Sequence, residues 1–145
     1  GAYLQDAPQI YKVLTLNGFR LVREFHVVGD NNMEQTYEYK GVTLDVMYFI
    51  QSEGEMWCYG AFFDPWRCEL GKPFYHQVTA HHFKPFTLGK ITFLNTEMSV
   101  PANTEEHLTE IFGSGYKVYD PNFKGDLNKI VYPWEEKTGI GFINY

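Results

Sequence analysis

The chain has 145 residues with a net charge of −6, and 44% of its residues are hydrophobic while 21% are charged. This length and composition are typical of one folded domain rather than of a disordered segment. The acidic balance and the scattered Lys and Arg argue against a general nucleic-acid binder, and no apolar run approaches the roughly 20 residues of a membrane-spanning helix. We therefore expect a single domain without direct membrane insertion.

The first half of the chain alternates between turn signals and apolar runs. Apolar residues at helical spacing precede Asn17-Gly18, a pair that stops helices, and β-branched or aromatic runs follow between turn-forming residues. The patterns predict a helix over 8–17 and strands over 19–28, 34–40, 42–50 and 56–63.

The second half has weaker patterns. We expect an irregular excursion over 66–84, a short hairpin around Leu88-Gly89-Lys90 within 86–94, an extended piece over 97–100 and a loop-like tail over 116–145. The order of elements predicts an α+β fold with a largely antiparallel or mixed sheet, a few flanking helices and a coil-rich C-terminal tail.

One helix is marked at both ends. Asn103 is a favourable N-cap residue and Glu106, three positions later, completes a capping-box pattern. An apolar stripe of Leu108, Ile111 and Phe112 follows, and Gly113 is a typical stop. The sequence therefore predicts a helix between Asn103 and Gly113.

Asp45 is the only charged residue in the run Val42–Ile50. The absence of clear alternation in this run predicts a strand that is buried on both faces, where a carboxylate is costly to desolvate unless it has a partner or a metal. A structural carboxylate would bond to a neighbouring strand or to Arg20 or Arg23. A functional one would bind a metal or take part in catalysis, and both interpretations stay open on the residues alone.

Other polar or reactive residues give weaker signals. Cys58 and Cys68 are too few for a disulfide scaffold, so we expect free thiols in a reducing, cytoplasmic compartment, although their pairing stays open. The segment 119–126, which contains Lys124, is a loop that suits either a turn or a functional site. Trp57, Trp66 and Trp134 suit core packing or the stacking of a flat ligand.

Three stretches in order resemble one protein family. They are GFRL at 18–21, GVTLDVMYF at 41–49 and VPANTEEHL at 100–108, the last of which continues into IFG at 111–113 and Tyr116. Their order and spacing resemble the C-terminal part of the LicD and fukutin family, and the resemblance covers most of the chain.

The resemblance implies a nucleotidyltransferase-like fold and a transferase activity. Members of this family move a phosphocholine or an alditol phosphate from a CDP-activated donor to a glycan hydroxyl, with Mg²⁺ as cofactor. By this resemblance Asp45 would be the metal ligand and catalytic carboxylate. Arg20, Arg23 and Lys124 would be candidate contacts for the substrate phosphates.

The chain departs from the family at one point. The family aspartate works with a DxD pair on an upstream strand, whereas the acidic residues before Asp45 are not so arranged: Asp6, Glu24, Asp30, Glu34 and Glu38. Because the chain opens Gly1-Ala2 without Met, we expect residues 1–145 to be one LicD/fukutin-like domain without the DxD portion. We expect it to be inactive alone, to use Mg²⁺ only with the upstream carboxylates, and to adjoin other domains of a larger parent chain.

Two rival functions remain on the sequence alone. The first is a non-catalytic module of the same fold that binds a glycan or a nucleotide-sugar. The second is an interaction domain without any small-molecule function, which would be favoured if no cleft surrounds Asp45.

Overall fold

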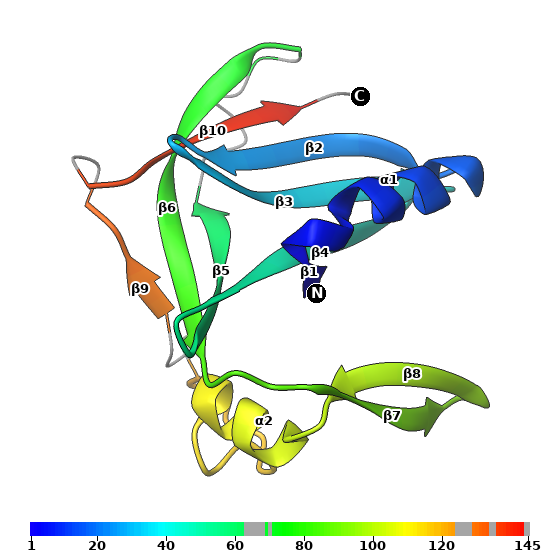
Figure 1. Ribbon diagram of the computed structural model, residues 1–145, viewed down its shortest axis with the longest axis vertical. Coiled ribbons are helices and arrows are strands. Elements are labelled where there is room, and N and C mark those ends of the chain that lie inside the picture. The colour runs from blue at the N-terminus through cyan, green and yellow to red at the C-terminus, as the bar shows by residue number, and fades with distance from the viewer. Residues whose placement is uncertain (63–68, 70, 124–128, 134–135, 144–145) are drawn as a thin grey trace.

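The computed structural model describes residues 1–62, 69, 71–123, 129–133 and 136–143 (Figure 1). Helix α1 spans Ala7–Leu16, helix α2 spans Thr104–Phe112, and a short 3₁₀ turn, η1, spans Leu4–Asp6. The strands are β1 (Ala2–Tyr3), β2 (Arg20–Val27), β3 (Asp30–Tyr39), β4 (Val42–Ser52), β5 (Glu55–Phe62), β6 (Pro73–Phe83), β7 (Leu88–Phe93), β8 (Thr96–Pro101), β9 (Lys129–Val131) and β10 (Thr138–Ile143). The fold is α+β, as the order of sequence patterns predicted, and the described residues are mostly in strands.

The main sheet folds back on itself. Its strands follow the order β1-β4-β3-β2-β10-β6-β5, β9 pairs with β6, and β5 also pairs with β4. Strand β4 pairs with β3 through Val42–Met47 and with β5 through Phe49–Ser52, so six strands form a closed ring. The sheet is mixed because β1 joins β4 in parallel, whereas the other pairings in the described residues are antiparallel.

Helix α1 covers one face of β2, β3 and β4 (Figure 1). Ile10 and Leu14 pack against the fully buried rings of Tyr37 and Tyr48. A proline in the first turn suits the start of the helix, and Gly18 at φ 85° lets the chain reverse into β2. Ile10 and Leu14 are half-buried, so each contributes only part of the roughly 1.5–3 kcal/mol of full burial, and together they hold the helix on the sheet.

A second apolar cluster links strands β2, β5 and β6. It contains Val27 of β2, Tyr59 of β5, and Val78 and Ala80 of β6, with Trp57 packed against it. The side chain of Trp57 therefore belongs to this cluster, which supports the core interpretation for that tryptophan.

Strands β7 and β8 form a separate hairpin that extends away from the main sheet (Figure 1). Its turn is at Leu94 and Asn95, both of which have positive φ angles of 47° and 61°. Such a turn matches the twist of a two-residue hairpin. The prediction of a hairpin around Leu88-Gly89-Lys90 is therefore wrong, because these residues run straight along β7.

Helix α2 has the predicted bounds, between Asn103 and Gly113. Its capping differs from the expected pattern, because the Asn103 side chain makes no hydrogen bond to the helix backbone and instead donates to Glu106 Oε2 at 3.2 Å. The first turn carries Glu105 and Glu106, whose charges favour a helix N-terminus.

Two segments that the sequence predicted to be irregular are strands. Strand β6 lies in the expected excursion and pairs with β5, β9 and β10, while β10 lies in the expected coil-rich tail and pairs with both β2 and β6. Gly139 and Gly141 made the sequence of β10 resemble a loop. Added Cβ atoms there would collide with the rings of His76 and Phe74 respectively, so the glycines are needed for close packing rather than for a loop.

Several sequence predictions concern residues outside the described ranges, namely those for Trp66, Cys68, Lys124 and Trp134. Cys58 lies on β5 and is buried. Within the described part of the chain, the helices are too short or too polar to span a membrane.

Candidate functional site

The polar residues near Asp45 are brought together by the register of β2, β3 and β4. Arg23 pairs with Thr36 on β3, and Thr36 pairs with Asp45 on β4, so the three residues form one row across the sheet. Paired residues of antiparallel strands share a face. The row therefore lies on the face of β3 opposite to Gln35 and Tyr37.

A β-bulge in β2 places a second arginine on the same face. The register shifts between Leu21 and Arg23, so Arg20 pairs with Glu38 although it lies three positions before Arg23. A bulge inserts one extra residue and resets the alternation of side chains. Leu21, two positions before Arg23, instead packs against the apolar cluster of Ala7, Tyr37, Val46 and Tyr48.

Asp45 is not in a strand that is buried on both faces. Its side chain is 53% exposed, and Val42 and Leu44 in the same strand are 69% and 42% exposed. Asp45 Oδ1 accepts a hydrogen bond of 2.5 Å from the Thr36 hydroxyl and lies 3.6 Å from a guanidinium nitrogen of Arg23. The partners that the sequence considered for a structural carboxylate, a neighbouring strand and Arg23, are thus both present, but the carboxylate remains open to solvent.

Glu34 is a second carboxylate on this face, two positions along β3 from Thr36. Burial raises the pKa of Glu34 above its usual value, the charge of Asp45 raises this pKa further, and a backbone hydrogen bond from Ala61 and the charge of Arg23 oppose these effects. Glu34 shares the face of β3 that carries Thr36 in the row with Arg23 and Asp45, so these charged groups form one cluster. We call Arg23, Glu34, Thr36 and Asp45 the Asp45 cluster.

The sequence missed Glu34 and Thr36 as members of this site. The available signal was the alternation in 34–40, which puts Glu34, Thr36 and Glu38 on one face of the strand. Only the register shows which of them lies beside Asp45.

Arg20 is not a member of the Asp45 cluster. Arg20 makes an ion pair of 2.9 Å with Glu38, and its side chain is 57% exposed. The Arg20–Glu38 pair forms the next row of the same face, so Arg20 lies near the cluster without contacting Asp45. Lys124 lies outside the described residues.

Comparisons with known proteins add nothing to this geometry. No known protein family, no curated protein and no solved structure matches this chain. The resemblance to the LicD and fukutin family therefore rests on the sequence motifs alone and stays a prediction.

The donor set of the cluster suits Mg²⁺ only in part. Among the described residues, no group of three or more His, Cys, Asp or Glu side chains is arranged to hold a metal ion. Mg²⁺ is often held by one or two carboxylates, with water and substrate phosphates completing the octahedron. Asp45 is open to solvent and suits one such ligand, with Glu34 as the second carboxylate of the cluster.

A buried hydrogen-bond network lies on the opposite face of the same strands. Gln35 Oε1 accepts from the hydroxyls of Tyr37 and Tyr48 at 2.8 and 2.7 Å, and Gln35 Nε2 donates to Glu24 Oε2 at 2.7 Å. His26 lies 2.7 Å from the other oxygen of Glu24 and holds the pKa of that carboxyl below its usual value. A satisfied network of this kind rigidifies the strands that carry the Asp45 cluster.

Proposed function

We propose that this chain is a LicD/fukutin-like domain of nucleotidyltransferase-like fold, and that the Asp45 cluster binds Mg²⁺ together with the phosphates of a CDP-activated donor. The observation that carries the proposal is the Asp45 carboxylate, which is half-exposed and lies in one row with Arg23. A carboxylate that is open to solvent pays little desolvation cost and can reach a soluble ligand. An open carboxylate with an arginine and a second acid beside it suits a metal–phosphate ligand.

Each member of the cluster has a role in this proposal. Asp45 supplies a metal ligand, and the hydroxyl of Thr36 orients it through the 2.5 Å hydrogen bond. Glu34 supplies a second carboxylate, whose raised pKa would fall on metal binding because the cation favours its ionised form. Arg23 is positioned to contact a phosphate oxygen, since its 3.6 Å approach to Asp45 leaves its hydrogen-bonding groups available for a ligand.

The bound metal would neutralise charge on the donor phosphates. In the family reaction a phospho-alcohol passes to a glycan hydroxyl, CMP leaves and the hydroxyl proton is released. The upstream pair of carboxylates that the family uses has no counterpart before Asp45 in this sequence. We therefore propose that the isolated chain binds CDP with Mg²⁺ but does not carry out the transfer.

Calorimetric titration of CDP tests the proposal. We expect CDP to bind in the presence of Mg²⁺ and to bind at least about tenfold more weakly without it, which corresponds to about 1.4 kcal/mol. Asp45→Asn keeps the side-chain shape but removes the ligand charge, so it should abolish this dependence on Mg²⁺.

Glu97→Gln is the matched control. Glu97 is an exposed acid on β8 that pairs with Lys90, far along the chain from the Asp45 cluster, and its substitution should leave CDP binding unchanged. Equal CDP binding with and without Mg²⁺ would contradict the metal role and favour the alternative of a non-catalytic nucleotide-sugar-binding module. A complete lack of CDP binding would contradict both.

A further inference from the structure

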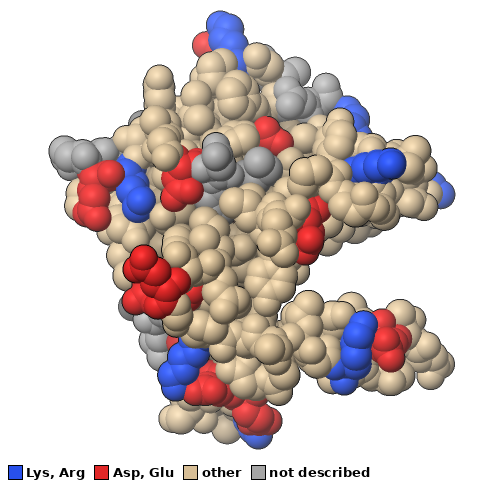
Figure 2. All heavy atoms as spheres, viewed as in Figure 1, with Lys and Arg blue, Asp and Glu red and all other residues tan. Residues whose placement is uncertain are grey.

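The C-terminal half of β4 borders two hollows that lie away from the Asp45 cluster. The first has a volume of about 600 Å³ and lies between η1 and the end of β4, from Phe49 to Gly54. The second has a volume of about 280 Å³ and lies between β1 and the base of the β7–β8 hairpin. Figure 2 shows the hairpin as an arm separated from the body by an open cleft. Tyr3 and Phe49 line both hollows, so we call the whole surface the Tyr3–Phe49 groove.

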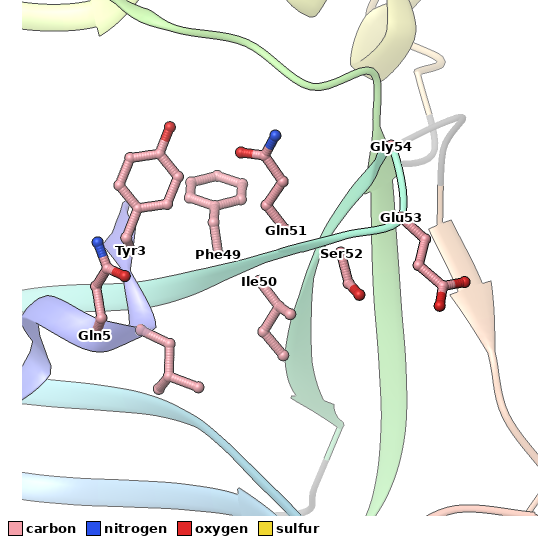
Figure 3. Close-up of a pocket in the computed structure, with 9 residues that line it drawn as sticks. Tyr3, Gln5, Phe49, Ile50, Gln51, Ser52, Glu53 and Gly54 are labelled. Carbon is pink, nitrogen blue, oxygen red and sulfur yellow. The ribbon is translucent and has the colours of Figure 1, made fainter.

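Two aromatic rings form the ridge between the hollows. In Figure 3 the side chains of Tyr3, Phe49 and Gln51 point to the same side of β4, whereas Ile50 and Ser52 point to the other. The Tyr3 hydroxyl donates to the carbonyl oxygen of Phe86 at 3.2 Å, which fixes the ring. The ring of Phe49 is held in edge contacts at 5.3 and 5.5 Å from the centroids of Phe83 and Phe86. The ridge is therefore held in place by these contacts.

Hydrogen-bonding groups surround this ridge. Gln5, Gln51, Ser52 and Glu53 line the first hollow, and most of these side chains are exposed. Strand β1 pairs with β4 at Tyr48 and Phe49. The backbone groups of β4 beyond Phe49 therefore also lie near the first hollow. Amides, hydroxyls and carboxylates can both donate to and accept from a neutral polar ligand.

The second hollow has further polar groups against an apolar wall. It is lined by Asp6, Ser99 and His107 as well as by the apolar side chains of Phe86 and Leu88. The Nδ1 atom of His107 is buried and has no hydrogen-bond partner among the described residues. A buried polar atom without a partner is costly, and a ligand in this hollow is one way to satisfy it.

The groove has no cationic side chain among its described lining residues. Asp6 and Glu53 are its acids, and burial lowers the pKa of His107, which keeps the imidazole neutral near pH 7. An anionic ligand such as a nucleotide or a free phosphate is therefore disfavoured by the charge of the site. A purely apolar ligand would displace water from these amides and carboxylates without replacing the lost hydrogen bonds.

We propose that the Tyr3–Phe49 groove binds a neutral carbohydrate. A sugar ring presents C–H groups on one face, which pack on an aromatic ring, and hydroxyls around its rim, which bond to amides and carboxylates. Tyr3 and Phe49 provide the rings, and Gln5, Gln51 and Asp6 provide the hydrogen-bonding groups. The inference does not depend on the role proposed for the Asp45 cluster, because it uses a different set of residues and an uncharged ligand.

Two-dimensional ¹H–¹⁵N NMR of the whole chain tests this inference with simple sugars as probes. Glucose, galactose, N-acetylglucosamine and their short oligomers would be titrated at millimolar concentrations, the range of weak carbohydrate binding. We expect at least one sugar to shift the side-chain amide signals of Gln51 and Gln5 and the backbone signals around Phe49. CMP, as an anionic probe, should not shift these signals.

Two pairs of variants separate binding from folding. Gln51→Ala should weaken the sugar affinity at least fivefold, whereas Gln9→Ala, which removes an exposed glutamine from α1, should not change it. Phe49→Leu keeps an apolar side chain but removes the flat ring, so it should also weaken binding, while Phe93→Leu on the exposed part of β7 should not.

Two outcomes would overturn the inference. The first is an absence of shifts in the groove with every sugar, and the second is an equal sugar affinity in Gln51→Ala, Phe49→Leu and the unmodified chain. Either outcome leaves the Mg²⁺-dependent binding of CDP to be judged on its own titration, so the two proposals can fail separately.

Discussion

Gly139→Ala tests the position of β10 in the ring of strands. A Cβ atom at residue 139 would overlap all three of the nearest atoms, and these belong to the imidazole ring of His76. His76 is only 3% exposed, and its Nδ1 lies 3.2 Å from the carbonyl oxygen of Gln77. The ring also packs edge-on against Phe25 at 5.3 Å between ring centroids, so moving it away from residue 139 disturbs this packing. We therefore expect the substitution to destabilise the fold.

The expected loss follows from the cost of overpacking a core. Inserting a methyl group into a well-packed site costs typically about 1–3 kcal/mol, and the direct overlap with a buried ring favours the upper end. A loss of about 3 kcal/mol corresponds to a fall in Tm of about 6–12 °C for a domain of this size. The free energy of unfolding from urea titration should fall by the same amount, with little change in the m-value.

Two further variants make the result specific. Gly115→Ala is the matched control, because an added Cβ there meets no atom within 4 Å, and we expect a change within about 0.5 kcal/mol. His76→Ala removes the colliding ring, so the double variant with Gly139→Ala should lose less stability than the sum of the two single variants. A neutral Gly139→Ala, or additive effects in the double variant, would refute the packing of β10 against His76.

Two other predictions concern the charge cluster and the buried network. Because burial and Asp45 raise the folded pKa of Glu34 above 4.5, the native state binds the proton more tightly than the unfolded state does, so stability should fall as pH rises from about 4.5 through that folded pKa. Asp45→Asn should make this fall smaller, as measured by urea unfolding at a series of pH values, and an unchanged or steeper fall would contradict the coupling. Tyr48→Phe removes one of two hydroxyl donors to Gln35, so it should cost about 1 kcal/mol, while Tyr75→Phe at a 71% exposed position should cost nothing measurable in the same thermal and urea titrations. Equal stabilities for the two tyrosine variants would contradict the role of the network.

The elements with strong local signals were predictable from the sequence. Helix α1 ends at the Asn17-Gly18 stop, α2 lies between Asn103 and Gly113, and β4 begins directly after the Lys40-Gly41 turn. In each case the boundary is set by a residue that favours a cap or a positive φ angle. Such preferences act within a few residues, so they can be read without knowledge of the packing.

Elements defined by distant contacts were not predictable. The glycines of β10 resemble those of a loop, yet Gly141 is needed because an added Cβ would lie 2.6 Å from the ring of Phe74. Strand β6 carries His76, His81 and His82 in a pattern without clear alternation, and its three neighbouring strands define it instead. Tertiary pairing overrides weak local preference in both cases.

The sequence identified Asp45 but gave the wrong surroundings. An apolar run predicted burial on both faces, whereas β4 is an outer strand along Val42–Asp45, where its other edge has no partner in the described structure. Arg23 was predicted as a neighbour, but the bulge that brings Arg20 to the same face is not visible in a pattern of alternating residues. Glu34 was available in the sequence and became a site residue only through the register of β3.

The Asp45 cluster and the Tyr3–Phe49 groove share one face of β4. Asp45 and Phe49 are four residues apart in β4, so the alternation of side chains puts them on one face, separated by about 13 Å along the strand. A single sugar in the groove cannot reach across this distance to a phosphate at Asp45. If both proposals hold, the groove therefore binds part of a longer glycan. The sugar unit that packs on Phe49 is then a different unit from the one whose hydroxyl lies near Asp45. For the same reason, titrations with CDP and with small sugars report on separate sites, and competition between them would contradict this arrangement.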